Sequence, residues 1–148
     1  MNLEENIIDD IKVFENAKME KLETLNLKKN KIKDIKAFKI AKFKGLKTLY
    51  LNGNNIKKIS ELNDVSFKTE LMRLDISGNE IDSVTDLFYD DIKQSKFDKL
   101  KTFNANKNYI QISDINQMKN LIKQKCPQII DIKIEEQKIE EQKKKNNK

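Results

Sequence analysis

Residues 22–32 read LETLNLKKNKI, and residues 46–56, which lie 24 positions later, read LKTLYLNGNNI. The kernel that they share is L-x-x-L-x-L-x-x-N-x-I. Three further copies follow in register: LMRLDISGNEI at 71–81, LKTFNANKNYI at 100–110 and the degenerate IIDIKIEEQKI at 129–139. An earlier, incomplete copy is marked by its tail, Leu3, Asn6 and Ile8. Because self-similarity at a fixed period is the signature of a stacked array, the chain is expected to be a repeat protein.

The kernel combines a short strand with a turn. In L-x-L, the period of two places the apolar residues on one face of a strand and the residue between them on the other. The asparagine that follows stands where the chain must turn, and its amide can bond the backbone of its own turn and of the neighbouring one. These asparagines, interpreted as a structural ladder, are Asn30, Asn54, Asn79 and Asn108. One unit is too small to bury its own apolar face, so stability must come from stacking.

This kernel resembles that of the leucine-rich-repeat family, and the resemblance covers nearly the whole chain. The copies are spaced by 24, 25, 29 and 29 residues. The short early repeats are similar to those of phosphatase-regulatory and axonemal dynein-associated proteins, and the long late ones to the ribonuclease-inhibitor type. The resemblance implies an α/β solenoid with a curved parallel β-sheet on its concave face and short helices or 3₁₀ turns on its convex face. Six units would make a sheet roughly 25 Å long.

The segments between kernels predict the convex elements. Residues 35–43 are expected to form a short 3₁₀ or α turn, and residues 82–97 and 113–125 have helical spacing, with Ser113 as N-cap and Pro127 ending the last helix. The apolar face of that helix is expected to be Ile115, Met118, Leu121 and Ile122. The solenoid is expected to span 1–134. Residues 135–148 are expected to form a charged tail, either a fraying helix or a disordered segment.

The register places three columns of side chains on the concave face. The first, between the last two apolar positions of each strand, is Asn2, Asn26, Tyr50, Asp75, Asn104 and Lys133. The second, before the central apolar position, is Thr24, Thr48, Arg73, Thr102 and Asp131. The third, just after the strand, is Glu4, Lys28, Asn52, Ser77, Asn106 and Glu135.

These columns contain the predicted partner-binding residues: Tyr50, Arg73, Asp75, Asn26, Asn104, Thr48 and Thr102. Tyr50 is the only aromatic residue in the columns, and the register sets it beside Arg73 and Asp75 of the next repeat. Aromatic residues and arginine are over-represented among the residues that dominate interfaces. Two alternatives stay open: a local Arg73–Asp75 pair covered by Tyr50, and a merely solvent-exposed strand face.

The composition argues against enzyme, metal and cofactor chemistry. The 148 residues suit one domain and include no histidine, which removes the commonest general base and transition-metal ligand. Three glycines and one proline leave little for a phosphate-binding loop. The acid pairs Asp9–Asp10 and Asp90–Asp91 are interpreted as solvated surface or helix caps. Cys126 is expected to be a buried small hydrophobe, and a single cysteine fits a reducing, cytoplasmic compartment. No apolar run approaches the ~18 residues of a membrane span.

The charge is banded along the chain. Six acids face two lysines in residues 1–20, twelve lysines face two acids in 21–60, and nine acids face two basic residues in 61–91. Such banding suits steering toward a partner of mixed charge. The lysines between Lys28 and Lys47 are expected on different sides of the solenoid, and the chain has only one arginine. Both features argue against nucleic-acid binding.

The sequence therefore predicts a non-enzymatic protein-interaction scaffold or regulatory subunit of a hetero-complex, cytoskeletal or ciliary, or phosphatase-regulatory. It would use its concave face and its N-terminal edge, which lacks a recognisable cap and which a partner or a second copy is expected to cover. The alternative is a ribonucleoprotein subunit that binds an RNA-binding protein or RNA.

Overall fold

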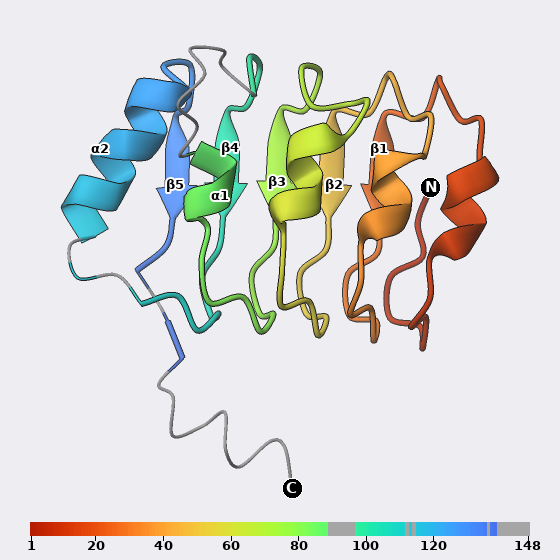
Figure 1. Cartoon of the computed structure of the whole chain (residues 1–148), viewed down its shortest axis with the longest axis horizontal. Coiled ribbons are helices and arrows are strands. Elements are labelled where there is room, and N and C mark those ends of the chain that lie inside the picture. The colour runs from red at the N-terminus through yellow and green to blue at the C-terminus, as the bar shows by residue number, and fades with distance from the viewer. Residues whose placement is uncertain (89–96, 112, 114, 136, 139–148) are drawn as a thin grey trace, which may run out of the picture.

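The computed structural model describes residues 1–88, 97–111, 113, 115–135, 137 and 138. Five parallel strands of three residues stand side by side in chain order. They are β1 (Thr24–Asn26), β2 (Thr48–Tyr50), β3 (Arg73–Asp75), β4 (Thr102–Asn104) and β5 (Asp131–Lys133). Figure 1 shows the strands as one layer with the helices in front of it. Each repeat thus contributes one strand and one convex segment, as the kernel predicts.

The register of the sheet is the register of the repeat. The central residues of neighbouring strands are partners, and all of them are buried: Leu25, Leu49, Leu74, Phe103 and Ile132. The incomplete first copy adds a sixth rung. An isolated parallel bridge joins Asn2 to Asn26, where the N–H of Leu3 donates to the carbonyl of Asn26 at 2.8 Å. The sequence periodicity therefore predicted both the pairing and its direction.

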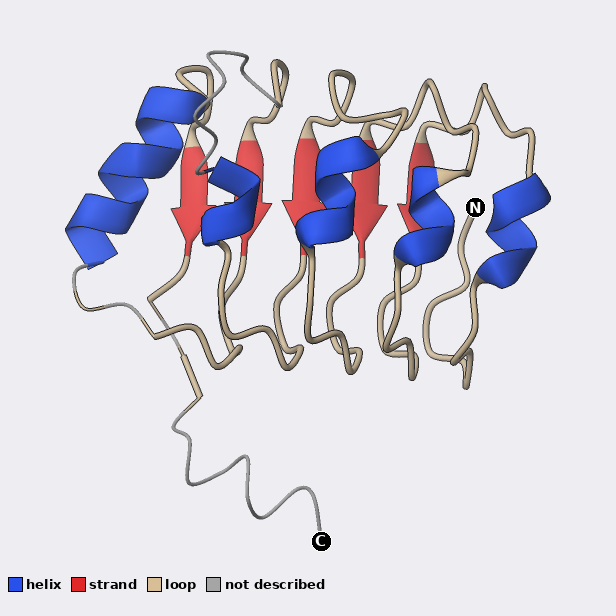
Figure 2. Ribbon diagram, in the orientation of Figure 1, coloured by secondary structure: helices blue, strands red, loops and turns tan. Residues whose placement is uncertain are grey.

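The convex face changes character along the chain, as Figure 2 shows. It carries the 3₁₀ helices η1 (Lys12–Asn16), η2 (Lys36–Lys39) and η3 (Ser60–Asp64), then the α-helices α1 (Thr85–Phe88) and α2 (Ile115–Lys125). The expected turn within residues 35–43 is η2. In α2, Ile122 is fully buried and the other three residues of the predicted apolar face pack against the core. Helix α2 ends at Lys125, before Pro127 as expected, and Ser113 lies two residues before its start.

The helix expected over residues 82–97 does not include residues 82–84 or residue 97. Helix α1 covers only Thr85–Phe88, and residues 89–96 lie outside the described residues. Val84 and Phe97 are buried from non-helical backbone. Phe97 stands in the turn that precedes the kernel, where the N–H of Leu100 donates to its carbonyl at 3.2 Å. Tertiary burial of these two side chains, rather than helical amphipathicity, explains the apolar spacing.

Phenylalanines fill the space between the sheet and the convex segments. Phe14 and Phe43 meet edge to face with ring centroids 5.5 Å apart, and Phe38 and Phe67 do so at 6.1 Å. These four rings belong to three successive repeats and are almost fully buried. Aromatic contacts of this geometry add about 0.5–1.5 kcal/mol beyond the area that they bury. The core is therefore continuous between repeats.

The predicted asparagine ladder holds the turns that follow the strands. In Asn79, which is fully buried, the side-chain amide donates to the carbonyl of Leu51 in the preceding repeat at 3.0 Å and to that of Ile76 in its own repeat at 2.9 Å. Its Oδ1 accepts the N–H of Ile56 at 3.1 Å. Asn30, Asn54 and Asn108 make equivalent bonds. Each amide thus ties two repeats together.

The ladder continues beyond the last strand. The amide of Gln137 donates to the carbonyls of Ala105 at 3.2 Å and Ile134 at 2.7 Å, which are the positions that an asparagine reaches in the other repeats. The ammonium of Lys138 donates to the carbonyl of Asn79 at 2.7 Å and lies 5.0 Å from the ring centre of Tyr109. Partial burial lowers the pKa of Lys138. Gln137 and Lys138, which belong to the charged tail expected from residue 135, therefore pack on the solenoid.

Replacing a ladder asparagine should destabilise the fold strongly. Asn79→Ala removes three hydrogen bonds to backbone carbonyls, each of which keeps one other donor, and leaves the N–H of Ile56 without its acceptor. We therefore expect a loss of about 2–4 kcal/mol in the free energy of unfolding, measured by urea denaturation. Asn52→Ala is the matched control, because the Oδ1 of Asn52 accepts no hydrogen bond from the described residues. Equal losses in both variants would contradict the ladder's role.

The residue before each ladder asparagine adopts the left-handed conformation. Gly53 and Gly78 have φ of 70° and 64°, and the equivalent Glu5, Lys29 and Lys107 have φ of 56°, 52° and 57°. A side chain in this region costs about 1–2 kcal/mol, whereas glycine adopts it freely. The sharp turn therefore imposes a left-handed backbone at this position whatever the residue type. In three of the five described repeats the residue is not glycine, so its backbone is strained.

Removing that strain should stabilise the protein. We expect Lys107→Gly to raise the free energy of unfolding by about 0.5–1 kcal/mol, since the strain relieved exceeds the backbone entropy that glycine loses. Gly78→Lys, the reciprocal change, should lower it, and both are measured by the midpoint of urea unfolding. A destabilised Lys107→Gly variant would show that the lysine is not strained.

Candidate functional site

The face of the sheet that looks away from the helices, called the concave face below, presents the predicted columns. The strand register aligns Asn26, Tyr50, Asp75, Asn104 and Lys133 in the first column. It aligns Thr24, Thr48, Arg73, Thr102 and Asp131 in the second. All of these side chains are exposed or half-buried, while the residues between them are buried. The geometry thus brings the seven predicted partner-binding residues onto one face.

Within the first column, three predicted residues hold their own turns. The Oδ1 of Asn26 accepts the N–H of Lys28 at 3.1 Å, and the Oδ1 of Asn104 accepts that of Asn106 at 3.1 Å. Asp75 accepts both the N–H and the hydroxyl of Ser77, at 2.9 and 2.7 Å. Short polar side chains commonly cap a turn two residues on in this way. This role was not predicted from the sequence, although the recurrence of Asn or Asp two residues before the turn was its signal.

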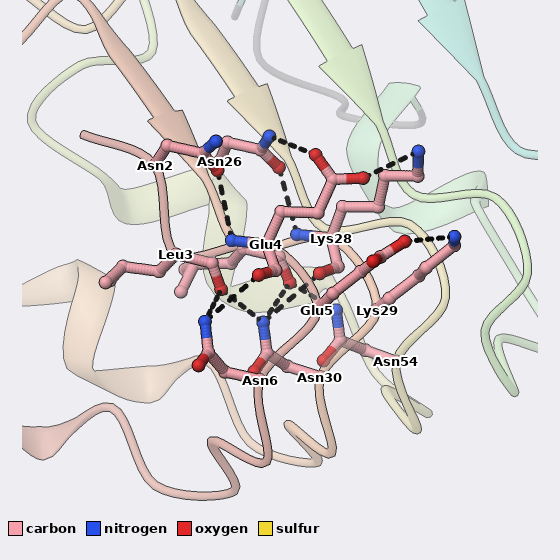
Figure 3. Close-up of polar contacts among 11 residues, drawn as sticks. Asn2, Leu3, Glu4, Glu5, Asn6, Asn26, Lys28, Lys29, Asn30 and Asn54 are labelled. Carbon is pink, nitrogen blue, oxygen red and sulfur yellow. Dashed lines mark hydrogen bonds and ion pairs between the residues drawn. The ribbon is translucent and has the colours of Figure 1, made fainter.

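The first two repeats neutralise each other's charges on this face, as Figure 3 shows. One oxygen of Glu4 lies 2.8 Å from the ammonium of Lys28, and the other accepts the amide of Asn26 at 2.9 Å. The hydrogen bond from Lys28 lowers the pKa of Glu4, with a second contribution from Asn26, and Glu4 in turn raises the pKa of Lys28. The N-terminal part of the concave face is therefore satisfied internally.

Arg73 has no such charged partner among the residues that the structure describes. Its guanidinium donates to the hydroxyl of Tyr50 at 3.5 Å, the outer limit of a hydrogen bond. Among the described residues no ion pair joins Arg73 to Asp75, whose other oxygen accepts the amide of Asn104 at 3.2 Å. The alternative of a local Arg73–Asp75 pair is therefore wrong, because Asp75 is held by the turn and by the next strand. Tyr50 and Arg73 remain together, as predicted.

A hollow adjoins these two residues. It measures about 130 Å³ and is lined by polar and apolar groups of four strands, namely Tyr50, Arg73, Leu74, Asp75, Thr102, Phe103, Asn104, Asp131 and Lys133. The hydroxyl of Thr102 is shielded from solvent, and no described residue hydrogen-bonds it. Two predicted residues, Asn26 and Thr48, lie outside the hollow. Lys133 and Asp131 line it and were missing from the predicted set.

Comparison with known proteins agrees with this geometry. Residues 20–64 match the family model described as Leucine Rich repeats (2 copies). A solved structure of an internalin (inlF) from Listeria monocytogenes is similar to the chain with a TM-score of 0.65 and 25% identity, covering 93% of this chain and 34% of that one. The chain has the fold of a leucine-rich-repeat solenoid. The resemblance in the kernel is thereby confirmed.

The solenoid spans about a third of the length of that internalin (34%). A solved structure of internalin C2 from the same species has a TM-score of 0.45 and 22% identity, covering 88% of the solenoid and 68% of that chain. No match is found among curated proteins.

Lysines of the solenoid pair with acids of the adjacent repeat. The pairs join Glu4 to Lys28, Glu5 to Lys29, Glu20 to Lys44, Glu23 to Lys47, Asp64 to Lys39, Glu80 to Lys57 and Glu70 to Lys99. Six of the nine lysines between Lys28 and Lys47 form an ion pair. Most of these side chains are exposed, and an exposed ion pair contributes little alone. The charge banding therefore supplies opposite charges at equivalent positions of neighbouring repeats.

The remaining candidate groups have structural roles. Asp10 and Asp34 accept the N–H of Lys12 and Lys36 at 2.7 and 2.8 Å, and so hold the turns into η1 and η2. Burial raises the pKa of the Cys126 thiol to about 11, which suits the expected buried hydrophobe. The pair Asp90–Asp91 lies outside the described residues.

Two features are absent from the described residues. In that part of the solenoid no group of three or more Cys, Asp or Glu side chains is arranged to hold a metal ion. None of its helices has the length and apolarity to cross a membrane.

The Glu4–Lys28 pair should make stability depend on pH. Because the folded pKa of Glu4 is lowered, the pair stabilises the fold above the ordinary pKa of a glutamate, about 4.3, and this stabilisation is lost as pH falls through the lowered value. We expect Glu4→Gln to lower the urea midpoint at pH 7 and to match the wild type near pH 2. Glu15→Gln, a change at a half-buried acid in η1, serves as control. A constant difference across this range would exclude the titration of Glu4 as its cause.

Proposed function

We propose that the solenoid is a non-enzymatic scaffold or regulatory subunit that binds another protein through its concave face. The observation that carries this proposal is the contrast along that face. In its N-terminal part the polar side chains bond one another. Tyr50, Arg73 and Thr102, by contrast, line a hollow, where the Arg73 guanidinium makes one long hydrogen bond and the Thr102 hydroxyl makes none with the described residues. Aromatic and arginine side chains around a recess are typical of residues that dominate protein interfaces.

The charges and the size of the hollow support a protein partner over the alternatives. A ribonucleoprotein role needs lysines available to phosphates, and most lysines between Lys28 and Lys47 are paired with acids. An enzyme site typically occupies about 300–1,000 Å³, more than the hollow offers. A larger hollow of about 540 Å³ by Asp9, Asp34 and Lys33 is lined by the acids that hold turns, and it lies apart from the concave columns.

Within this proposal, the solenoid belongs to a cytoplasmic hetero-complex, and the resemblance of its early repeats favours a cytoskeletal, ciliary or phosphatase-regulatory one. The N-terminal edge is the second contact surface. Ile7 and Val13 of the first repeat are 79% and 75% exposed there, whereas Ala37, the equivalent of Val13 in the next repeat, is buried.

Affinity capture from native lysate tests the proposal. The baits are the wild type and the double variant Tyr50→Ala with Arg73→Glu, each captured with and without nuclease. We expect the double variant to lose at least about tenfold of a nuclease-resistant protein partner, because hot-spot residues contribute more than about 1.4 kcal/mol each.

The matched control is Lys123→Glu on α2, an exposed position of the convex side, which should retain partners bound by the concave face. All baits must unfold at similar urea concentrations. Retention of every partner by the double variant would overturn the concave-face assignment, and loss of the partners on nuclease treatment would favour the ribonucleoprotein alternative.

A further inference from the structure

We infer that the hollow beside Arg73 binds a single carboxylate side chain of the protein partner. This inference rests on the proposed function, and it names the chemistry of the residue that the partner inserts. Three features of the hollow carry it: a cation that forms no ion pair with the described residues, a second donor that finds no acceptor among them, and a size that admits one side chain.

The cation is the only arginine of the chain. Arg73 stands at the start of β3, in the middle of the five-stranded sheet, and its side chain is exposed. Within the described residues its guanidinium makes no ion pair, and its one hydrogen bond is the 3.5 Å contact with Tyr50. A guanidinium presents five N–H donors in a planar fork that matches a carboxylate. Most of these donors therefore face the hollow or solvent.

The acids near Arg73 are engaged elsewhere. Asp75 accepts two hydrogen bonds from Ser77 and one from Asn104, which leaves its carboxylate largely satisfied. Asp131 lies two strands away from Arg73, about 10 Å at the ordinary strand spacing, and it is near its own cation, Lys133, at 3.8 Å. Neither acid replaces the missing partner of Arg73.

The second donor is Thr102. It is the direct strand neighbour of Arg73, and its hydroxyl is shielded from solvent without a hydrogen-bond partner among the described residues. A buried hydroxyl left unpaired costs about 1–3 kcal/mol, and a ligand oxygen placed between Arg73 and Thr102 would recover that cost. The aromatic ring of Tyr50 forms the neighbouring wall, and its hydroxyl already touches the guanidinium.

Size and charge select a carboxylate over a larger or more highly charged anion. The hollow of about 130 Å³ admits one side chain. A phosphate group carries more negative charge and would meet Asp75 and Asp131 in the lining, with only Arg73 and Lys133 to offset them. An aspartate or glutamate of the partner presents the two oxygens that the arginine fork and the threonine hydroxyl require.

A phage-displayed library of random 12-residue peptides provides the probe. The intact chain is used as wild type, Arg73→Glu, Arg73→Lys, Thr102→Val and Tyr50→Ala. Lys123→Glu on α2, an exposed position of the convex side, makes the same change of charge and serves as control. Affinities of selected peptides are then measured with the acid intact and with the acid changed to its amide.

We expect wild-type selection to enrich an aspartate or glutamate at one position. The amide peptide should bind at least about tenfold more weakly, as should the acidic peptide to Arg73→Glu, with a smaller loss for Arg73→Lys because lysine lacks the planar fork. Thr102→Val should weaken binding severalfold without lowering stability, since the hydroxyl has no partner to lose. The control should bind as the wild type does.

The contrary outcomes separate the two proposals. Peptides that need Tyr50 but bind equally as acid and amide would overturn the carboxylate inference and leave concave-face binding intact. If the selected peptides bind the Tyr50→Ala and Arg73→Glu variants as tightly as the wild type, or if the selection enriches no peptide, both proposals would be overturned. Unchanged affinity in Thr102→Val would remove that hydroxyl from the site.

Discussion

The buried asparagine amide is the interaction on which this solenoid depends. The chain reverses direction after every strand, and each reversal leaves carbonyl groups inside the protein with no strand to pair them. Asn54 bonds the carbonyl of Leu51 in its own repeat at 2.9 Å and that of Leu27 in the preceding one at 3.0 Å. Because a buried carbonyl without a partner costs about as much as a hydrogen bond gives, one amide fixes both the turn and the stacking of two units.

Once that stacking is fixed, every equivalent position forms a column. Apolar columns make the core, in which Phe14, Phe38 and Phe67 meet across successive repeats. Charged columns place the acids of one repeat beside the lysines of the next, as in Glu23 and Lys47. The same constraint aligns the concave face, so a departure from the repeating chemistry stands out against its neighbours.

Such a departure occurs in the middle of the sheet. The side-chain oxygens of Asn26 and Asn104 accept hydrogen bonds from their own turns, and Glu4 neutralises Lys28. Tyr50 cannot cap a turn and Arg73 has no acid at the equivalent position of its neighbours, Thr48 and Thr102. Binding chemistry is thus concentrated where the repeat pattern is broken, while the scaffold around it is held rigid by the ladder and the core.

The sequence by itself determined the fold, its register and the membership of each column, because a kernel repeated in register permits only one way to bury all of its apolar residues together. It also determined the structural role of Asn30 through Asn108, and it brought Tyr50 and Arg73 to one place. It could not determine where the helix within residues 82–97 begins. Val84 and Phe97 are buried from non-helical backbone, and their spacing in the sequence is the same as that of residues on one face of a helix.

The tertiary structure alone decided which concave side chains are available. Hydrogen bonds of Asn26, Asp75 and Asn104 depend on the turn geometry, and the isolation of Thr102 depends on what lies within about 3.5 Å of its hydroxyl. A periodic pattern specifies which face a residue occupies, but the atoms that reach it are set by three-dimensional distances between repeats. For that reason the face was predictable from the sequence, and the hollow beside Arg73 was not.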